Sequence, residues 1–250
     1  MKRKTSSTRL DRVLVERGLA DTPQKALAMI LAGEVKVNGE RSGKAGTHVA
    51  QDARIEIASR VPKYVSRGGA KLEGALEDFG VDPTGRLCMD IGSSNGGFTD
   101  CLLQHGAARV YAVDVNVDQL DWKLQQDPRV IRIERNAREI RKEDIPELVS
   151  IIVIDVSFIS VRKVIAPVIG LAGPGCDFII LIKPQFELPR EDIAAGGVVT
   201  DKRLHEKVIL GVRAEVESIG LKCIAVRPSR LTGAEGNQEY FLQARKKTME

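Results

Sequence analysis

The 250-residue chain has no long hydrophobic run, no paired cysteines and no repeated or low-complexity segment. No apolar stretch approaches the ~20 residues that a membrane-spanning helix needs. The first residues, MKRKTSST, lead into charged residues rather than into the apolar core of a secretory signal. We therefore expect a cytoplasmic protein that has no membrane partner.

The cysteines are scattered along the chain and form no CxxC pair of the kind that holds zinc. No other cluster of metal-ligating residues stands out, so we expect no metal site. Four buried, reduced thiols are the simpler interpretation. These residues are Cys88, Cys101, Cys176 and Cys223.

The positive charge is concentrated at one end of the chain. Residues 1–60 hold 12 Lys and Arg against 7 Asp and Glu, a net charge of +5, whereas residues 61–250 hold 26 against 27, a net charge of −1. Clustered Lys and Arg neutralise phosphates and release counterions, so this asymmetry indicates a polyanion-binding module beside a neutral body. A solvated charged surface is the alternative.

The N-terminal residues predict two short helices followed by a small β unit. Apolar residues at helical spacing begin near Arg9, and Thr22 with the following proline begins a second helix that Gly33 ends. The alternating segment VKVNG then ends in a strong tight-turn signal. We expect residues 1–59 to form a small α+β domain and the aperiodic residues 60–67 to form a linker.

Residues 68–250 predict an α/β domain with an open, mostly parallel sheet. Short apolar runs recur along this segment, with helical patterns between most of them, so helices should cover both faces of the sheet. The candidate strands are RLCMDIG, RVYAVDV, RVIRI, SIIVIDV, DFIILIK, KCIAVRP and EYFLQA.

The first of these strands runs into a glycine-rich turn, DIGSSNGGFT, before a helix. Glycines at such a turn let the backbone approach a nucleoside ligand at the edge where parallel strands end. The dinucleotide pattern GxGxxG is not met, and the aspartate before Gly92 suits a ligand with an ammonium group, such as S-adenosylmethionine, better than a pyrophosphate. An unrelated glycine turn is the alternative. The expected cofactor-binding residues of the turn are Asp90, Gly92, Ser93, Ser94, Gly96, Gly97 and Phe98.

Polar residues also follow the second and third strands. Asp114 lies 24 residues after Asp90, where a carboxylate accepts hydrogen bonds from the ribose hydroxyls of a nucleoside, although a helix N-cap has the same pattern. Asn136 can offer a donor and an acceptor to an adenine edge, or can simply form a turn. With Val115 and Ala137, these residues are expected to line the cofactor pocket.

Two further strands end in charged residues that an apolar core would not select. IIVID ends at Asp155 and FIILIK ends at Lys183, so a carboxylate and an ammonium group emerge from neighbouring strands. Burying either without a partner would cost several kcal/mol, so we expect them to face each other or a ligand. Their position at the cofactor edge favours an active site over a purely structural ion pair, and Asp155 is also expected to contact the cofactor.

The order Lys71, Asp155, Lys183, Glu239 resembles the Lys-Asp-Lys-Glu tetrad of the FtsJ-type ribose 2′-O-methyltransferases. More narrowly, SRGGAKL, DIGSSNGGFTD, IIVIDVSFIS, LIKPQFE and GNQEYFL together are similar to the haemolysin A (TlyA)-like ribosomal RNA methyltransferases, over essentially the whole chain. The resemblance implies a Rossmann-like class I methyltransferase fold with seven strands and S-adenosyl-L-methionine as cofactor. It also implies ribosomal RNA as partner, with a cytidine ribose as the expected target.

The resemblance further implies that the tetrad is catalytic and acts on a ribose 2′-hydroxyl. Lys183 is expected either to accept the hydroxyl proton or to stabilise the developing alkoxide, while Asp155 and Glu239 orient the lysines. Without the resemblance, Lys71 fits a solvent-facing lysine equally well, and Glu235 lies in the same loop as Glu239.

The segment QFELPREDIAAGGVVT follows Lys183. It is long and contains two glycines, so we expect it to move when RNA binds. It also contains Glu187, a third carboxylate near the expected site, to which the sequence assigns no role.

Residues 9–57 resemble the RNA-binding domain first seen in ribosomal protein S-four, through RLDRVLVERGL, KALAMILAGEVKVNG and VAQDARIEI. That domain usually carries Ser-Arg where this chain has Thr22-Pro23, so a phosphate-contacting arginine is missing and Lys25 is the expected substitute. The expected RNA-binding residues are Arg9, Arg12, Lys25, Lys36, Lys44 and Arg67.

Two other functions stay open at this point. One is a non-catalytic RNA-binding or ribosome-assembly factor with a vestigial cofactor pocket. The other is a cytolysin, the activity behind the older family name, which would need a membrane-inserting segment that the sequence does not show.

Overall fold

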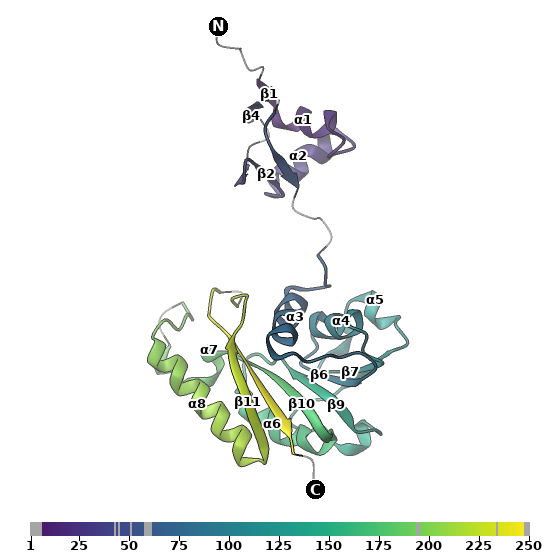
Figure 1. Cartoon of the computed structure of the whole chain (residues 1–250), viewed down its shortest axis with the longest axis vertical. Coiled ribbons are helices and arrows are strands. Elements are labelled where there is room, and N and C mark those ends of the chain that lie inside the picture. The colour runs from purple at the N-terminus through teal and green to yellow at the C-terminus, as the bar shows by residue number, and fades with distance from the viewer. Residues whose placement is uncertain are drawn as a thin grey trace. The chain divides into compact units, whose positions relative to one another are not determined.

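The structure, a computed structural model, describes residues 7–42, 44, 46–50, 52–57, 62–193, 196–233 and 235–247. The chain divides into two compact units, Met1–Pro62 and Lys63–Glu250, and each is described by itself (Figure 1). The expected boundaries at 1–59 and 68–250 stay predictions. Within the expected linker, residues 60 and 61 lie outside the described residues.

The first unit contains two helices and two small antiparallel sheets. The elements are β1 (Ser7–Arg9), α1 (Leu10–Glu16), α2 (Pro23–Leu31), β2 (Val35–Val37), β3 (Glu40–Arg41), β4 (His48–Ala50) and β5 (Ile55–Ile57). Strand β2 pairs with β3 and β5, and β1 pairs with β4. Both expected helices are present, and VKVNG forms β2 with the expected tight turn, whereas the sequence analysis did not anticipate the β1–β4 pair.

Local signals in the sequence explain where these elements begin and turn. The Thr22 hydroxyl accepts a hydrogen bond from the Lys25 backbone N–H at 3.2 Å, which caps α2 as expected. Asn38 and Gly39 have φ values of 53° and 89°, the left-handed pair that a tight hairpin turn between β2 and β3 requires. Leu10, Leu14, Ile30 and other apolar side chains from both helices form the buried core of the unit.

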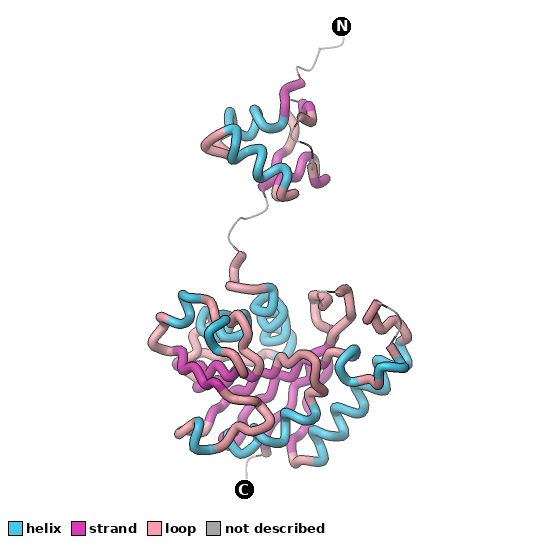
Figure 2. The backbone as a smooth tube through the Cα atoms, turned by 180° about the vertical axis from the view of Figure 1, so that it is seen from behind, coloured by secondary structure: helices cyan, strands magenta, loops and turns pink. Residues whose placement is uncertain are grey.

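The second unit contains a seven-stranded sheet in the order β11-β12-β10-β9-β6-β7-β8 (Figure 2). Strand β12 runs antiparallel to its two neighbours, and the other pairs are parallel. This is the mostly parallel sheet that the sequence predicted. The strands are β6 (Leu87–Ile91), β7 (Arg109–Asp114), β8 (Val130–Glu134), β9 (Val149–Ile154), β10 (Ala172–Ile182), β11 (Leu221–Pro228) and β12 (Tyr240–Lys246).

Helices cover both faces of this sheet. They are α3 (Arg67–Phe79), α4 (Gly97–Gln104), α5 (Trp122–Gln125), α6 (Arg162–Val168), α7 (Pro184–Glu187) and α8 (Lys202–Ser218). Short 3-10 turns lie at Val117–Gln119, Lys142–Asp144, Ile169–Leu171 and Arg190–Asp192. Alternate strand residues point to opposite faces, so each strand supplies both cores.

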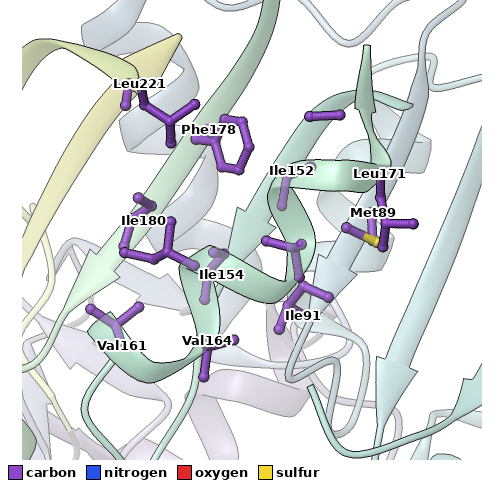
Figure 3. Close-up of a cluster of buried hydrophobic side chains, with 14 of the residues drawn as sticks. Met89, Ile91, Ile152, Ile154, Val161, Val164, Leu171, Phe178, Ile180 and Leu221 are labelled. Atoms are coloured by element: carbon purple, nitrogen blue, oxygen red, sulfur yellow. The ribbon is translucent and has the colours of Figure 1, made fainter. Parts of the chain in front are cut away.

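The two cores show this division clearly. Phe178 and Ile180 of β10 pack with α6 and α8 in one core, part of which is drawn in Figure 3. Ile179 and Leu181, the residues between and after them, pack with α3 and α4 in the other. A slip of β10 by one residue would therefore move each of its apolar side chains into the opposite core. This constraint fixes the register of the strand and so the position of its end.

Three of the expected buried thiols are buried, and one is not. Cys88, Cys101 and Cys176 are buried, and burial raises the pKa of each thiol to about 12. Cys223 is only half-buried because it lies on β11, the edge strand of the sheet. All four are free thiols. Among the described residues, no helix is long and apolar enough to cross a membrane.

A buried carboxylate joins three strands at the middle of β10. The Asp177 side chain is 6% exposed and accepts hydrogen bonds from Arg86 at 3.0 Å and Arg245 at 2.7 Å. Gln243 donates a further hydrogen bond to it at 3.4 Å. Because Arg86 precedes β6 and Arg245 lies on β12, the cluster fixes both to β10.

We expect Asp177→Ala to lower the free energy of unfolding by about 2–4 kcal/mol, because two guanidinium groups lose their carboxylate. Urea denaturation of the whole chain measures the change. Asp78→Ala is the matched control, since Asp78 pairs with Arg230 at the surface and should cost less than about 1 kcal/mol. Equal losses for both variants would contradict the stabilising role of the cluster.

Candidate active site

The charged residues named by the sequence gather at one edge of the sheet. Asp90 lies near the end of β6 and Asp114 ends β7, while Asp155 follows β9 and Lys183 follows β10. These strands are adjacent and parallel in the order β10-β9-β6-β7, so their carboxyl ends lie side by side (Figure 1). Three adjoining pockets open at this edge and share lining residues, among them Asp155 and Lys71.

The glycine-rich turn after β6 is shaped by a close backbone contact. Gly92 has a φ of 84°, and a Cβ atom on it would lie 2.2 Å from the Asp155 carbonyl oxygen. Its backbone N–H donates to the Val113 carbonyl at 2.9 Å. The turn therefore lies directly against the strand ends on both sides, which only glycine allows.

The other residues of the turn divide between lining and support. Gly92, Ser93, Ser94, Gly97 and Phe98 line the first pocket, about 410 Å³ in volume. Gly96 is buried with a φ of 92°, and a Cβ atom on it would lie 2.3 Å from the Leu124 side chain. Gly96 thus lies close against α5, and its expected contact with the cofactor stays a prediction.

Asp90 is fully buried beneath the turn. The Thr99 hydroxyl donates to its Oδ2 atom at 2.7 Å, whereas its Oδ1 atom has no hydrogen-bond partner among the described residues. Desolvation raises the pKa of this carboxyl from 3.8 to about 7. The pKa of Asp90 is higher in the folded chain than in the unfolded chain, so protonation of Asp90 favours folding. This contribution to the free energy of unfolding is fully present below pH 3.8 and is lost as the pH rises through about 7.

Asp114 supports the turn and also lines the second pocket. Its carboxylate accepts hydrogen bonds from the backbone N–H groups of Ser94 at 2.9 Å and Asn116 at 3.1 Å. Asn136 forms the turn that the sequence allowed, since its Oδ1 atom accepts from the Arg138 N–H at 3.1 Å. The second pocket is lined by Asp114, Val115, Asn136, Ala137 and Asp155, all of which the sequence predicted.

The four residues of the tetrad form two ion pairs. Lys71 Nζ lies 2.5 Å from Glu239 Oε2, and these side chains are only 11% and 3% exposed. Lys183 Nζ pairs with Asp155 Oδ1 and donates to the Ser157 hydroxyl at 2.9 Å. Lys71 is therefore not a solvent-facing lysine.

The pockets bring the two ion pairs together. Lys71 and Asp155 both line the first pocket, while Lys71, Lys183 and Glu239 line the third. Glu235 also lines the third pocket, but Glu239 is the carboxylate that pairs with Lys71. Two lysines and two carboxylates thus line adjoining pockets beside the glycine turn, and their four charges sum to zero.

The loop that carries Glu239 is held by a residue that the sequence analysis missed. Asn237 is buried, and its amide donates to the Gly197 carbonyl and accepts from the Val199 N–H, each at 2.9 Å. His205 bonds the Val199 carbonyl at 2.8 Å and the Tyr240 hydroxyl at 2.9 Å. These bonds attach residues 197–199, the end of the segment expected to move, to Asn237 and His205. Residues 194 and 195 of that segment lie outside the described residues.

A second missed residue is Phe158, which lines both the second and the third pocket. It has a left-handed φ of 64°, unusual for an aromatic residue, and is 92% exposed. Its ring centroid lies 5.1 Å from that of Phe186. Single exposed apolar side chains are common on protein surfaces, so the position of this ring in the lining of two pockets, rather than its exposure, suggests contact with a ligand. The only available signal was its place in DVSFIS, three residues after Asp155.

The basic residues predicted to bind RNA lie at several sites. Arg9 and Arg12 line one pocket of the first unit, together with Asp11, which pairs with Arg9 at 2.6 Å. Lys44 lines another pocket beside Arg41. Lys25 pairs with Asp21, and Lys36 is exposed on β2. Arg67 lies in the second unit, where it lines the first pocket of the site and donates to the Thr232 carbonyl at 3.2 Å.

The sheet order, the glycine turn and the pockets at the strand ends define an α/β enzyme of the methyltransferase fold. A family model described as FtsJ-like methyltransferase matches residues 64–246, and one described as S4 domain matches residues 8–55. The chain belongs to the FtsJ-like methyltransferase family and carries an S4 domain at its N-terminal end.

Individual relatives match nearly the whole chain. The 16S/23S rRNA (cytidine-2′-O)-methyltransferase TlyA of Mycobacterium tuberculosis is 42% identical over 96% of this chain and 90% of its own length. Hemolysin A of Brachyspira hyodysenteriae is 44% identical over 93% of this chain and 98% of its own. A solved structure named as a hemolysin, from Streptococcus thermophilus, matches with a TM-score of 0.74 and 37% identity, covering 97% of this chain and 90% of that one.

We expect Gly92→Ala to destabilise the chain by more than about 3 kcal/mol, because its new methyl group would collide with backbone rather than with a flexible side chain. Gly85→Ala is the matched control, since Gly85 has a φ of 69° but no atom near its Cβ position, and should cost about 1 kcal/mol. Thermal unfolding measures both. A loss for Gly92→Ala no larger than the control would show that the close contact is unimportant.

Proposed function

We propose that this chain is an S-adenosylmethionine-dependent methyltransferase that acts on the ribose 2′-hydroxyl of a cytidine in ribosomal RNA. The convergence of two lysines and two carboxylates beside the glycine turn is the observation that carries the proposal. Family membership supports the reaction, and the name of the Mycobacterium relative supports the nucleotide and the RNA. Such a substrate places the enzyme in the cytoplasm.

The unpartnered polar atoms of the turn support this cofactor. Asp90 Oδ1 and the buried Ser93 hydroxyl both lack a protein partner among the described residues. An α-ammonium group near Asp90 would neutralise a carboxylate that is costly to bury. Asp114 and Asn136 would bind the ribose and adenine in the second pocket. When bound, S-adenosylmethionine supplies a sulfonium methyl group that is already electrophilic.

The task of the tetrad is to orient the attacking hydroxyl and to manage its proton. Lys183 would lie closest to the oxygen, where its ammonium group, fixed by Asp155 and Ser157, would stabilise the developing alkoxide while the hydroxyl proton passes to solvent. Only a neutral Lys183 amine could instead accept that proton itself. Lys71, held by Glu239, would add a second positive charge beside the oxygen. Because the four charges sum to zero, the site binds a neutral hydroxyl without building up net charge.

The remaining features fit an RNA substrate. Phe158 offers an exposed ring at the pocket mouth, and aromatic stacking is a common way to hold an unstacked base. The S4 domain carries Arg9, Arg12 and Lys44 on its surface, where phosphate contacts would position the RNA without reading its sequence. Arg67 would contact the RNA, or the cofactor, within the site itself.

Transfer of tritium from labelled S-adenosylmethionine to ribosomal subunits that lack the modification tests the proposal. We expect Lys183→Ala to lower kcat about 100-fold or more, because the hydroxyl loses its cationic partner. Lys163→Ala, at an exposed position of α6, should retain wild-type activity. Wild-type protein that binds RNA but transfers no label would instead indicate a non-catalytic RNA-binding factor.

Cofactor affinity should depend on pH through Asp90. Its pKa of about 7 means that the carboxylate able to hold an ammonium group forms as the pH rises through that value. We therefore expect S-adenosylhomocysteine to bind about tenfold more tightly at pH 8 than at pH 6, by isothermal titration. Asp90→Asn should bind weakly with no such dependence. A flat wild-type profile, or an unchanged slope in the variant, would contradict this assignment.

A further inference from the structure

Glu187 is a buried carboxylate next to the site that has no part in the mechanism above. It is the last residue of α7, four residues after Lys183, and its side chain is 2% exposed. A carboxylate taken out of water in this way needs hydrogen bonds to both oxygens.

Both oxygens of Glu187 bond the segment that follows Asp155. Oε1 accepts from the Val161 N–H at 2.6 Å, and Oε2 accepts from the Ser160 hydroxyl at 2.6 Å and from Arg162 Nε at 3.2 Å. Helix α6 begins at Arg162 and has no side-chain cap from its own first residues. Glu187 therefore supplies from another element the negative charge that a helix start favours.

These bonds close a ring of contacts around the reactive lysine. The ring runs from Asp155 along the loop to Val161, crosses to Glu187, returns along α7 to Lys183 and closes through the Lys183–Asp155 ion pair. Ser157, which bonds Lys183, lies on the loop side of the ring.

The two aromatic residues of the pocket mouth lie on the same ring. Phe158 is on the loop and Phe186 is on α7, directly before Glu187, and their ring centroids are 5.1 Å apart. Phe158 also has the left-handed backbone described above. Such a strained conformation persists only where contacts on both sides hold the loop. Glu187 fixes that end.

We propose that Glu187 is a positioning residue that holds the Asp155–Val161 loop in register with the Lys183 turn, and so sets the alignment of the target hydroxyl with the cofactor. The inference rests on the proposed function. It assigns to Glu187 no contact with substrate or cofactor. Glu187 acts indirectly, through Asp155, Ser157 and Phe158. Its bonds to Ser160, Val161 and Arg162, here called the Glu187 cross-link, fix the positions of these three residues relative to Lys183.

Glu187→Ala and Glu187→Gln separate positioning from simple stability. Alanine removes every bond that the Glu187 side chain makes and keeps only the bond from Arg162 to the residue 187 carbonyl, so we expect kcat at saturating cofactor and RNA to fall about 10- to 100-fold, while KM for RNA changes less than about threefold. Glutamine keeps the shape and can still accept from the Val161 N–H and donate to the Ser160 oxygen. It should restore kcat to within about threefold of the wild type.

Asp177→Ala is the matched control, because it removes another buried, arginine-bound carboxylate from the same sheet. Asp177 lies six residues before Lys183 along β10, about 20 Å away. Measured below the unfolding temperature of every variant, Asp177→Ala should lose stability and keep its kcat within about twofold. The proposal would be overturned if kcat fell in both alanine variants in proportion to the free energy of unfolding that each variant loses.

Amide hydrogen exchange gives a readout that needs no activity. In Glu187→Ala, peptides that cover residues 155–162 should exchange faster than in the wild type, and in Asp177→Ala they should not. Unchanged exchange would overturn the proposal, and so would faster exchange with an unaltered kcat. An inactive wild-type protein would count against the proposed function, and the cross-link itself would then be judged by the exchange result alone.

Discussion

The ion pair between Lys183 and Asp155 is the interaction on which the site depends. Strands β9 and β10 run parallel and adjacent, so the residue that follows each strand reaches the same edge of the sheet. A lone ammonium or carboxylate would be costly to bury there, whereas the pair satisfies both charges. Lys71 and Glu239 repeat the arrangement from a helix and a loop, so the charges of these four residues cancel in pairs.

Different surroundings give the buried carboxylates of the second unit different tasks. Asp177 is enclosed by two arginines and joins strands, whereas Glu187 bonds a helix start and joins a loop to a turn. Glu239 holds a lysine. In Asp90, one buried oxygen has no hydrogen-bond partner in the described part of the chain, and the pKa is raised to about 7. That imbalance is what a charged ligand can correct.

Much of the fold could be predicted because its signals are local. Each strand of the large sheet is a short apolar run, and Thr22 caps α2 through a bond within four residues of chain. The tetrad was found through motif order, which requires no knowledge of distances. The pairing of Lys71 with Glu239 follows from the fold, since 168 residues separate them in the sequence.

The contacts that sequence reasoning missed are those with weak local patterns. Strand β1 (Ser7–Arg9) contains no apolar residue and the apolar residues of β4 (His48–Ala50) are adjacent, so neither shows the alternation that marks β2. Asn237 acts on a segment 38 to 40 residues away, and nothing in its own neighbourhood indicates that partner. The sequence also gave no sign that Gly96 leaves no room for a Cβ atom beside Leu124, since that neighbour lies outside the motif. A motif identifies the turn but does not say which face each residue presents.

The position of the methyl group on the product tests the central claim most directly. Labelled ribosomal RNA can be digested to nucleosides and analysed by mass spectrometry against synthetic standards. A site built to hold and activate a hydroxyl predicts 2′-O-methylcytidine as the labelled nucleoside, with its loss in Lys183→Ala. A methyl group on the base, at carbon or nitrogen, would contradict the account, because the paired lysines and carboxylates would then have no hydroxyl to act on.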